Sequence, residues 1–123
     1  MKPAYPTFAL VVAVGLALAG APAPAAAPKG RTVHGAIAVN RDTQGFGYAY
    51  DARTTTDARR EALKQCGERK CEVLVNFKNG CAAVASTQRK LVSMTGVTRD
   101  EAETKALRKC GAECKLLAWA CTR

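Results

Sequence analysis

The sequence predicts a two-layer α+β domain, made of two repeated strand–strand–helix–strand units that form about six strands with two helices packed on the sheet. The segment 57–71, DARREALKQCGERKC, recurs 44 positions later as 101–114, EAETKALRKCGAEC. A match at a fixed offset indicates an internal duplication. Residues of alternating polarity flank the copies, as in strands, and six cysteines in the same region favour disulfide cross-links.

The first 25 residues have the pattern of a secretory signal peptide. Lys2 precedes the apolar run Phe8–Leu18, and small residues with Ala-x-Ala sites follow it. Cleavage is expected after Ala19 or Ala25. The apolar run is short for a membrane span, so an uncleaved anchor is the less favoured alternative. The protein is therefore expected to be secreted or periplasmic, with no integral membrane association after cleavage.

A tether and one domain follow the signal peptide. Residues 26–33 form a Pro/Ala-rich tether, and residues 34–123 contain both repeats, 35–79 and 80–123. Loss of Lys2 leaves 18 basic against 10 acidic side chains, a side-chain charge of +8. This excess favours an acidic polymer or an acidic protein as partner, with nucleic acid less favoured, although it can also serve solubility alone.

The first repeat begins with a predicted β-hairpin. Gly35–Asn40 is small and apolar, and Phe46–Tyr50 alternates strictly, with Phe46, Tyr48 and Tyr50 on one face. The residues between the two segments are polar and end in glycine, which is typical of a turn. The aromatic face has two interpretations, a stacking platform or cross-strand core packing. Core packing is favoured here, and also for Trp119, because a small sheet domain needs aromatic mass.

A helix and a third strand complete the first repeat. The threonine run 54–56 suits a helix N-terminus, and residues 58–66 place alanines at spacings of three and four. Gly67 can end this helix in the left-handed conformation. Residues 73–77 alternate as a strand, and Asn79-Gly80 predicts a turn.

The second repeat follows the same order. Residues 80–85 and 91–95 are its two strands, the second one weaker in pattern. Thr98 and Glu101 have the spacing of a capping box, in which each side chain bonds the other residue's free amide. The helix then ends before Gly111, and residues 114–121 form the last strand.

The six cysteines are expected to form three disulfides in an exported chain. Each repeat has one cysteine at the end of its helix and one shortly after, so local pairing is favoured. The favoured pairs are Cys66–Cys71, Cys110–Cys114 and Cys81–Cys121. A zinc site made of the four cysteines in the two local pairs is the alternative, but its spacings and export disfavour it. No Cys-x-x-Cys motif supports thiol redox catalysis.

Catalytic patterns are weak in this chain. His34 is the only histidine, so no Ser-His-Asp arrangement can form elsewhere. Many acidic residues lie beside basic ones on the predicted helices. Exposure to solvent and favourable interaction with the positive end of the helix dipole account for them without a catalytic role. A carboxylate-dependent hydrolase is therefore the least favoured function, and the sequence implies no catalytic residue, metal or cofactor.

Eight side chains are candidates for a binding surface. Basic dipeptides would form one patch if the two helices shared a face, and otherwise they are ordinary solvated surface. The candidates are Arg59, Arg60, Arg69, Lys70, Arg108, Lys109, Tyr48 and Tyr50.

Nearly all of residues 35–123 resembles the DUF4189 family. The resemblance lies in Gly35–Val39, the aromatic–glycine strand, Ala62-Leu63-x-x-Cys66, Cys71 with its apolar strand, and Asn79–Ala83. It implies a small exported bacterial protein with a disulfide-bonded domain and unassigned function, and it carries over no catalytic residue.

The favoured function is that of a secreted, basic, non-enzymatic binding protein that acts at the cell envelope or outside the cell. The alternative is a small secreted inhibitor or effector directed at a protein target. The two hypotheses share the export signal, the disulfides and the positive charge, and differ in the partner.

Overall fold

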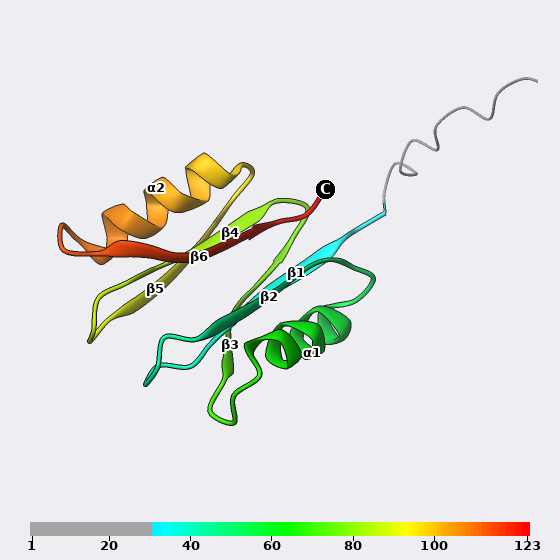
Figure 1. Cartoon of the computed structure of the whole chain (residues 1–123). Helices are drawn as coiled ribbons and strands as arrows, with labels where there is room; N and C mark the ends of the chain where they lie inside the picture. Colours follow the sequence, from blue (N-terminus) through cyan, green and yellow to red (C-terminus); the bar gives the residue numbers. More distant parts are fainter. Residues whose placement is uncertain (1–30) are drawn as a thin grey trace, which may run out of the picture.

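The computed structural model describes residues 31–123, which form eight elements (Figure 1). The predicted signal peptide and most of the tether lie outside the described residues. The elements in chain order are β1 (His34–Val39), β2 (Phe46–Ala52), α1 (Thr55–Cys66), β3 (Glu72–Lys78), β4 (Cys81–Ser86), β5 (Leu91–Gly96), α2 (Arg99–Cys110) and β6 (Lys115–Cys121). Six strands and two helices in repeated strand–strand–helix–strand order confirm the predicted fold class.

Each repeat forms its own three-stranded sheet. The first sheet has the order β2-β1-β3 and the second β5-β4-β6, and every pairing between neighbouring strands is antiparallel. Asn79 has a φ of 47° in the turn that carries the chain from the first sheet to the second. Within each repeat, the helix and its sheet form two layers. The two sheets face each other, so the full order is helix–sheet–sheet–helix (Figure 1).

Three hydrophobic clusters correspond to the three interfaces between these layers. The central strands alternate, so one set of side chains faces the other sheet and the next set faces the helix. On the helix side, Ala36 and Ala38 pack against Ala58 and Ala62. Small side chains on both surfaces let the helix lie close to the sheet. Between the sheets, the buried cluster is Ile37, Val39, Phe77, Ala82, Val84, Ala118 and Ala120.

The helix ends follow the sequence signals closely. The Thr54 hydroxyl accepts a hydrogen bond from the Asp57 amide at 3.0 Å, and Gly67 ends α1 with a φ of 69°. In α2 the Thr98 hydroxyl accepts from the Glu101 amide at 3.2 Å. The predicted capping box is altered at one point, because the Glu101 carboxylate accepts from the amide of Val97, one residue before the cap, at 3.2 Å.

This arrangement should make the stability of the domain sensitive to acid. The hydrogen bond from Lys105, then the bond from the Val97 amide, lowers the pKa of Glu101. Because its pKa is lower in the folded state, the carboxylate stabilises the fold above its unfolded pKa of about 4.3, and this stabilisation is lost as the pH falls through the folded value. Glu101→Gln should therefore be less stable than the native chain at pH 7, with the difference shrinking towards pH 3 in denaturant unfolding.

Glu61→Gln is the matched control, because Glu61 is a helical glutamate that makes no ion pair within residues 31–123. A loss of stability in Glu101→Gln that is as large at pH 3 as at pH 7 would contradict the role assigned to its charge.

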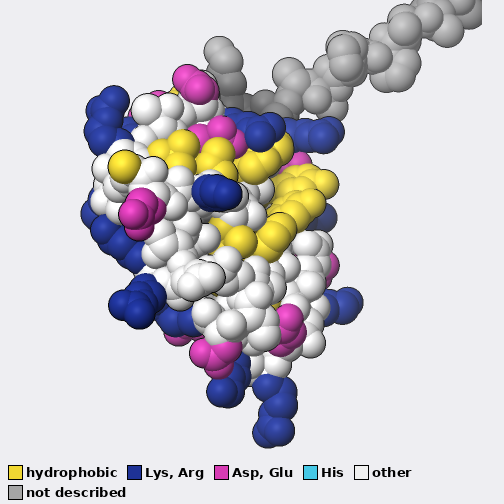
Figure 2. All heavy atoms as spheres, turned by 60° about the vertical axis from the view of Figure 1, so that its left-hand side comes forward, with side chains coloured by type: hydrophobic (Ala, Val, Ile, Leu, Met, Phe, Trp, Pro, Cys, Tyr) yellow, Lys and Arg dark blue, Asp and Glu magenta, His cyan; other side chains and the backbone are white. Residues whose placement is uncertain are grey.

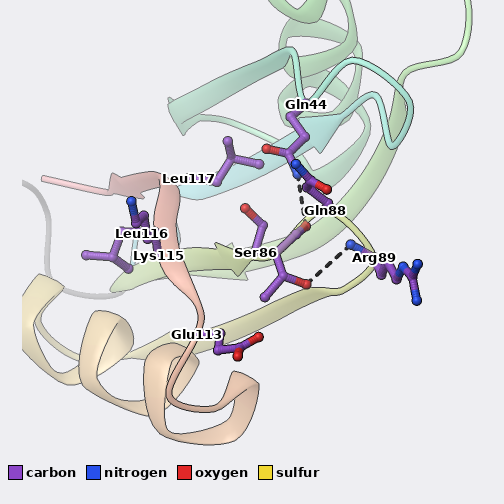
Figure 3. Close-up of a pocket in the computed structure, with 9 residues that line it drawn as sticks. Gln44, Ser86, Gln88, Arg89, Glu113, Lys115, Leu116 and Leu117 are labelled. Atoms are coloured by element: carbon purple, nitrogen blue, oxygen red, sulfur yellow. Dashed lines mark hydrogen bonds between the residues drawn. The ribbon is translucent and has the colours of Figure 1, made fainter.

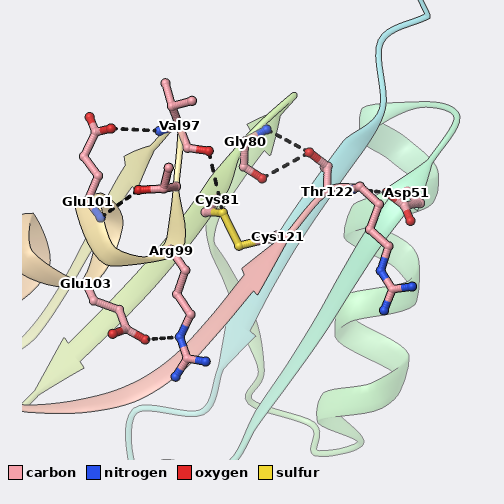
Figure 4. Close-up of a disulfide and its surroundings, with 11 residues drawn as sticks. Asp51, Gly80, Cys81, Val97, Arg99, Glu101, Glu103, Cys121 and Thr122 are labelled. Carbon is pink, nitrogen blue, oxygen red and sulfur yellow. Dashed lines mark hydrogen bonds and ion pairs between the residues drawn. A yellow bond between two sulfur atoms is a disulfide. The ribbon is translucent and has the colours of Figure 1, made fainter. Parts of the chain in front are cut away.

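All six cysteines are bonded in disulfides. Two of the three disulfides, Cys66–Cys71 and Cys110–Cys114, join the end of a helix to the start of the strand after it. The third, Cys81–Cys121, joins residues of β4 and β6 that are 40 positions apart (Figure 4). These are the pairs that the sequence favours, and they leave no thiol for the alternative zinc site. Neither helix in the described part is long and apolar enough to cross a bilayer.

Candidate functional site

The aromatic face of β2 is not part of the core. Phe46, Tyr48, Tyr50 and Trp119 are 42, 37, 48 and 41% exposed, respectively. The prediction that these rings pack in the core is therefore wrong, and the alternative, a stacking platform on Phe46, Tyr48 and Tyr50, stays a prediction. Exposed rings need an explanation other than stability, because in a small domain burying them would contribute more to folding.

The position of β2 explains the exposure. Side chains directly opposite in an antiparallel pair share a face, so Phe46 and Tyr48 lie beside Val39 and Ile37, on the side towards the second sheet. The other face of β2 is closed to large side chains, because a Cβ on Gly47 would meet backbone atoms of α1 at 2.2 Å. Since β2 is the edge strand of its sheet, the facing sheet covers its rings only in part.

These rings form one side of a groove between the edge strands β2 and β6. The groove has a volume of about 490 Å³ and is lined by Phe46, Tyr48 and Tyr50, by residues 117–121 of β6, and by Arg123. On the face that Figure 2 shows, hydrophobic side chains gather in a band that Lys and Arg side chains border. Large exposed apolar patches of this kind usually mark binding sites.

The rings have a defined arrangement. Tyr48 and Tyr50 stack with their ring centroids 6.2 Å apart and their planes 20° apart. Trp119 is paired with Ala83 at the edge of the second sheet, and the guanidinium of Arg99 lies 3.7 Å from the centre of its ring. Arg99 also forms an ion pair of 2.6 Å with Glu103, which holds the guanidinium in place (Figure 4).

The residues after β6 hold one end of the groove. The Thr122 hydroxyl accepts a hydrogen bond from the Gly80 amide at 2.8 Å, and the Arg123 amide donates to the Asp51 carboxylate at 2.7 Å (Figure 4). Asp51 has a φ of 56°, a conformation uncommon for residues other than glycine. These contacts fix the backbone of Arg123 beside the rings, while its guanidinium makes no ion pair within residues 31–123.

A second hollow continues the groove along β6. It has a volume of about 780 Å³ and shares Leu117 with the first (Figure 3). Two cationic side chains, Arg89 and Lys115, line it together with the carboxylate of Glu113. The amide of Gln44 donates to the Thr87 carbonyl at 2.9 Å, which joins the two hairpin loops at this end. We call the two hollows together the β6 trough.

The second repeat shows that this fold does not require the rings. On the face of β5 towards the first sheet, Leu91 packs against the inter-sheet cluster, and the residues opposite Val84 and Ala82 are Ser93 and Thr95. The corresponding residues of β2 are Phe46 and Tyr48. Two copies of one architecture thus carry polar residues in one case and aromatic residues in the other, so the aromatic choice on β2 has a reason outside the fold.

The predicted basic residues do not come together on one surface. Arg59 and Arg60 lie on α1 and Arg108 and Lys109 on α2, and the two helices cover opposite outer faces of the molecule (Figure 1). Arg69 and Lys70 follow α1, and the Lys70 ammonium is paired with Asp42 at 3.2 Å. None of these six residues lines the trough.

Of the eight candidates, only Tyr48 and Tyr50 lie in the groove. The basic residues that line the trough, Arg123, Arg89 and Lys115, were not among the eight candidates. Arg89 belongs to a basic dipeptide in a predicted turn, and the other two are single charges in a predicted strand or at the end of the chain. No sequence signal places them near the rings.

Comparison with known proteins places the chain among mycobacterial relatives. It is 35% identical over 88 residues to the uncharacterized protein Rv1813c of Mycobacterium tuberculosis and to the uncharacterized protein Mb1843c of Mycobacterium bovis. The match covers 72% of this chain and 59% of each relative, so the chain spans about three fifths of their length. The NMR structure of Rv1813c is similar as well, with a TM-score of 0.58 and 33% identity over 72% of this chain and 74% of that one.

Residues 34–121, which include every strand and helix described above, match the family described as "Domain of unknown function (DUF4189)". The three disulfide pairs lie wholly within this match, and so do the two repeats apart from residues 122 and 123. The chain therefore belongs to the DUF4189 family.

Proposed function

We propose that this protein is an exported, non-enzymatic binding protein that holds an extended acidic partner in the β6 trough. The observation that carries this proposal is the set of three exposed aromatic side chains of β2 along one groove, with cationic side chains at the ends of the trough that form no ion pair within residues 31–123. Aromatic rings supply contact area with little loss of side-chain freedom, and cations give affinity for an acidic partner.

The lining of the groove supports binding rather than catalysis. Within the described residues, the side chains around it are aromatic or aliphatic, apart from the disulfide-bonded Cys121 and the guanidinium of Arg123. Such a surface contributes contact area but holds no group that could serve as a nucleophile or as a general base near neutral pH. The Glu113 carboxylate lines the second hollow and lies away from the rings.

Action outside the cytoplasm is part of the proposal. Three disulfides in a chain of 123 residues favour an oxidising compartment. The signal-peptide pattern of the first 25 residues supports the same location.

A protein target for a secreted inhibitor or effector is the second candidate function. The observation that favours it is the position of β2 and β6, each an edge strand of its sheet, because an edge can pair with an added strand of another chain. Binding of this kind would depend on backbone hydrogen bonds along an edge, and it would survive the loss of the aromatic side chains.

Trp119 provides the test, because it is the only tryptophan and it lines the groove. The oxidised exported protein would be titrated at low salt with polyglutamate, polygalacturonate, hyaluronate and oligothymidylate while the Trp119 fluorescence is followed. At least one polymer should bind. The variant Phe46→Ser with Tyr48→Thr, which copies the second repeat, should weaken that binding by about tenfold, because each ring contact contributes roughly 0.5–1.5 kcal/mol.

Arg59→Ala with Arg60→Ala is the control, since it removes two charges from α1 and nothing from the trough. It should weaken binding by no more than about threefold, because charges away from the contact act only through the long-range field. The proposal is wrong if no polymer binds, or if the control loses as much affinity as the groove variant.

A further inference from the structure

We infer that the ligand of the β6 trough is an acidic glycan in which uncharged sugar rings separate the acid groups. This inference rests on the proposed function, since it names the chemistry of the partner that the trough holds. It follows from three features of the trough, namely its length, the order of charged and aromatic residues along it, and the spacing of the two stacked rings.

The trough has the shape required for a chain rather than for a compact molecule. Its two hollows share Leu117 and together follow β6 from Lys115 to Arg123. The seven residues of β6 span about 23 Å at roughly 3.3 Å per residue. A ligand that contacts both ends at once must therefore be extended over several monomers.

Charge is distributed unevenly along this path. Arg89 and Lys115 lie at one end, where Glu113 offsets one of the two charges, and Arg123 lies at the other end. In the groove, from Leu117 to the end at Arg123, the lining is aromatic or aliphatic apart from the disulfide-bonded Cys121, whereas polar side chains add to the second hollow, namely Gln44, Ser86, Thr87 and Gln88. Arg99 lies over Trp119 on the side of α2 and lines neither hollow, and its charge is countered by Glu103. The complementary ligand therefore carries acid groups at separated points and presents uncharged surface to the middle of the trough.

The middle part suits sugar rings. The C–H faces of a pyranose are apolar and can lie on an aromatic ring, while its hydroxyl groups remain at the edge, where they can bond to water or to a phenol. Tyr48 and Tyr50 each offer a phenol hydroxyl that both donates and accepts. The three exposed rings of β2 provide such faces along one side of the groove. Trp119 lies opposite Ala83, on the face of the second sheet towards α2.

A nucleic-acid strand fits the same trough poorly. It carries one phosphate for every nucleotide, so several phosphates would lie opposite the middle part, where no unpaired cation lines the groove. The gap between the Tyr48 and Tyr50 rings also admits no base, because their centroids are 6.2 Å apart and a base inserted between them needs about 7 Å, twice the carbon–carbon contact distance. A polymer of glutamate has the same excess of charge along its length.

The test compares defined polymers on the oxidised, exported protein by Trp119 fluorescence and calorimetry. The probes are hyaluronate oligosaccharides, which alternate a uronate with an uncharged amino sugar, together with dextran, polyglutamate and oligothymidylate of similar length. Hyaluronate should bind at least tenfold more tightly than each of the other three. Lys115→Gln with Arg123→Gln should weaken hyaluronate binding about fivefold and leave dextran binding unchanged, because it removes charge and no ring.

Two pairs of tyrosine substitutions distinguish a loss of binding caused by missing ring contacts from one caused by misfolding. Tyr48→Phe with Tyr50→Phe should keep binding within about threefold, since it retains both rings, and Tyr48→Ala with Tyr50→Ala should lose at least about tenfold. Intact mass before and after reduction checks that each variant keeps three disulfides. If polyglutamate or oligothymidylate binds best through the same rings, the glycan inference is wrong and the proposed function stands. If dextran binds as tightly as every acidic probe, both the glycan inference and the acidic partner of the proposed function are wrong. Absence of binding by all four probes, together with polygalacturonate, overturns both.

Discussion

The double replacement of Cys81 and Cys121 by alanine should lower the free energy of unfolding by about 4 kcal/mol. The reason is that the disulfide closes a loop of 40 residues and so restricts the conformations of the unfolded chain. The bond holds β6 against β4 and so keeps Ala118 and Ala120 in the core between the sheets. A loss of this size is a large fraction of the stability of a typical small domain. Urea unfolding of the oxidised double variant, compared with the native protein, measures it.

Replacement of Cys110 and Cys114 by alanine is the matched control. Cys110 and Cys81 are equally buried, but this bond closes a loop of only four residues and should contribute about 2 kcal/mol. Equal losses in the two double variants would show that loop length is not the reason for the larger effect of the Cys81–Cys121 bond.

Replacing Gly47 with alanine should destabilise the domain by about 3 kcal/mol or more, because the added methyl group overlaps fixed backbone. A Cβ on Gly47 would lie 2.2 Å from the amide nitrogen of Cys66 and 2.3 Å from the carbonyl oxygen of Ala62. Relief of both contacts requires α1 to move away from the sheet, which opens the alanine cluster beneath it. Thermal and denaturant unfolding both measure this loss.

Gly45→Ala tests whether any added methyl group near this helix is harmful. The nearest atom to a Cβ on Gly45 is the carboxylate oxygen of Glu68, at the end of a flexible side chain, so this variant should lose less than about 1 kcal/mol. If Gly47→Ala is as stable as Gly45→Ala, close approach of α1 to β2 is not what requires glycine at position 47.

Several features of the fold were predictable because they depend on local pattern. The alanine periodicity and the terminal glycines fix α1 and α2, and alternation of side chains fixes the strands. The favoured disulfide pairs could be proposed because two of them are short-range and occur at equivalent places in the two repeats.

The binding site was harder to predict because it depends on neighbours that are distant in sequence. Alternation places Phe46, Tyr48 and Tyr50 on one face, but it does not say whether another layer covers that face. Coverage depends on β2 being an edge strand and on the extent of the second sheet, and neither property is written in the local pattern. The basic residues of α1 and α2 likewise lie apart, because each helix covers its own sheet and the packing of the two sheets places the helices on opposite sides.

The sequence by itself determined the two repeats, their order of strands and helix, and the basic character of the chain. Only the tertiary structure decided that the repeats form two sheets packed face to face, and that β2 and β6 meet at their edges with four aromatic side chains exposed. The physical reason is that helix and strand patterns arise from contacts between near neighbours in the chain. The groove arises from packing between β2 and β6, which lie about 70 residues apart in the chain. Which side chains stay exposed there depends on how far the faces of the two sheets overlap, and no local pattern encodes that overlap.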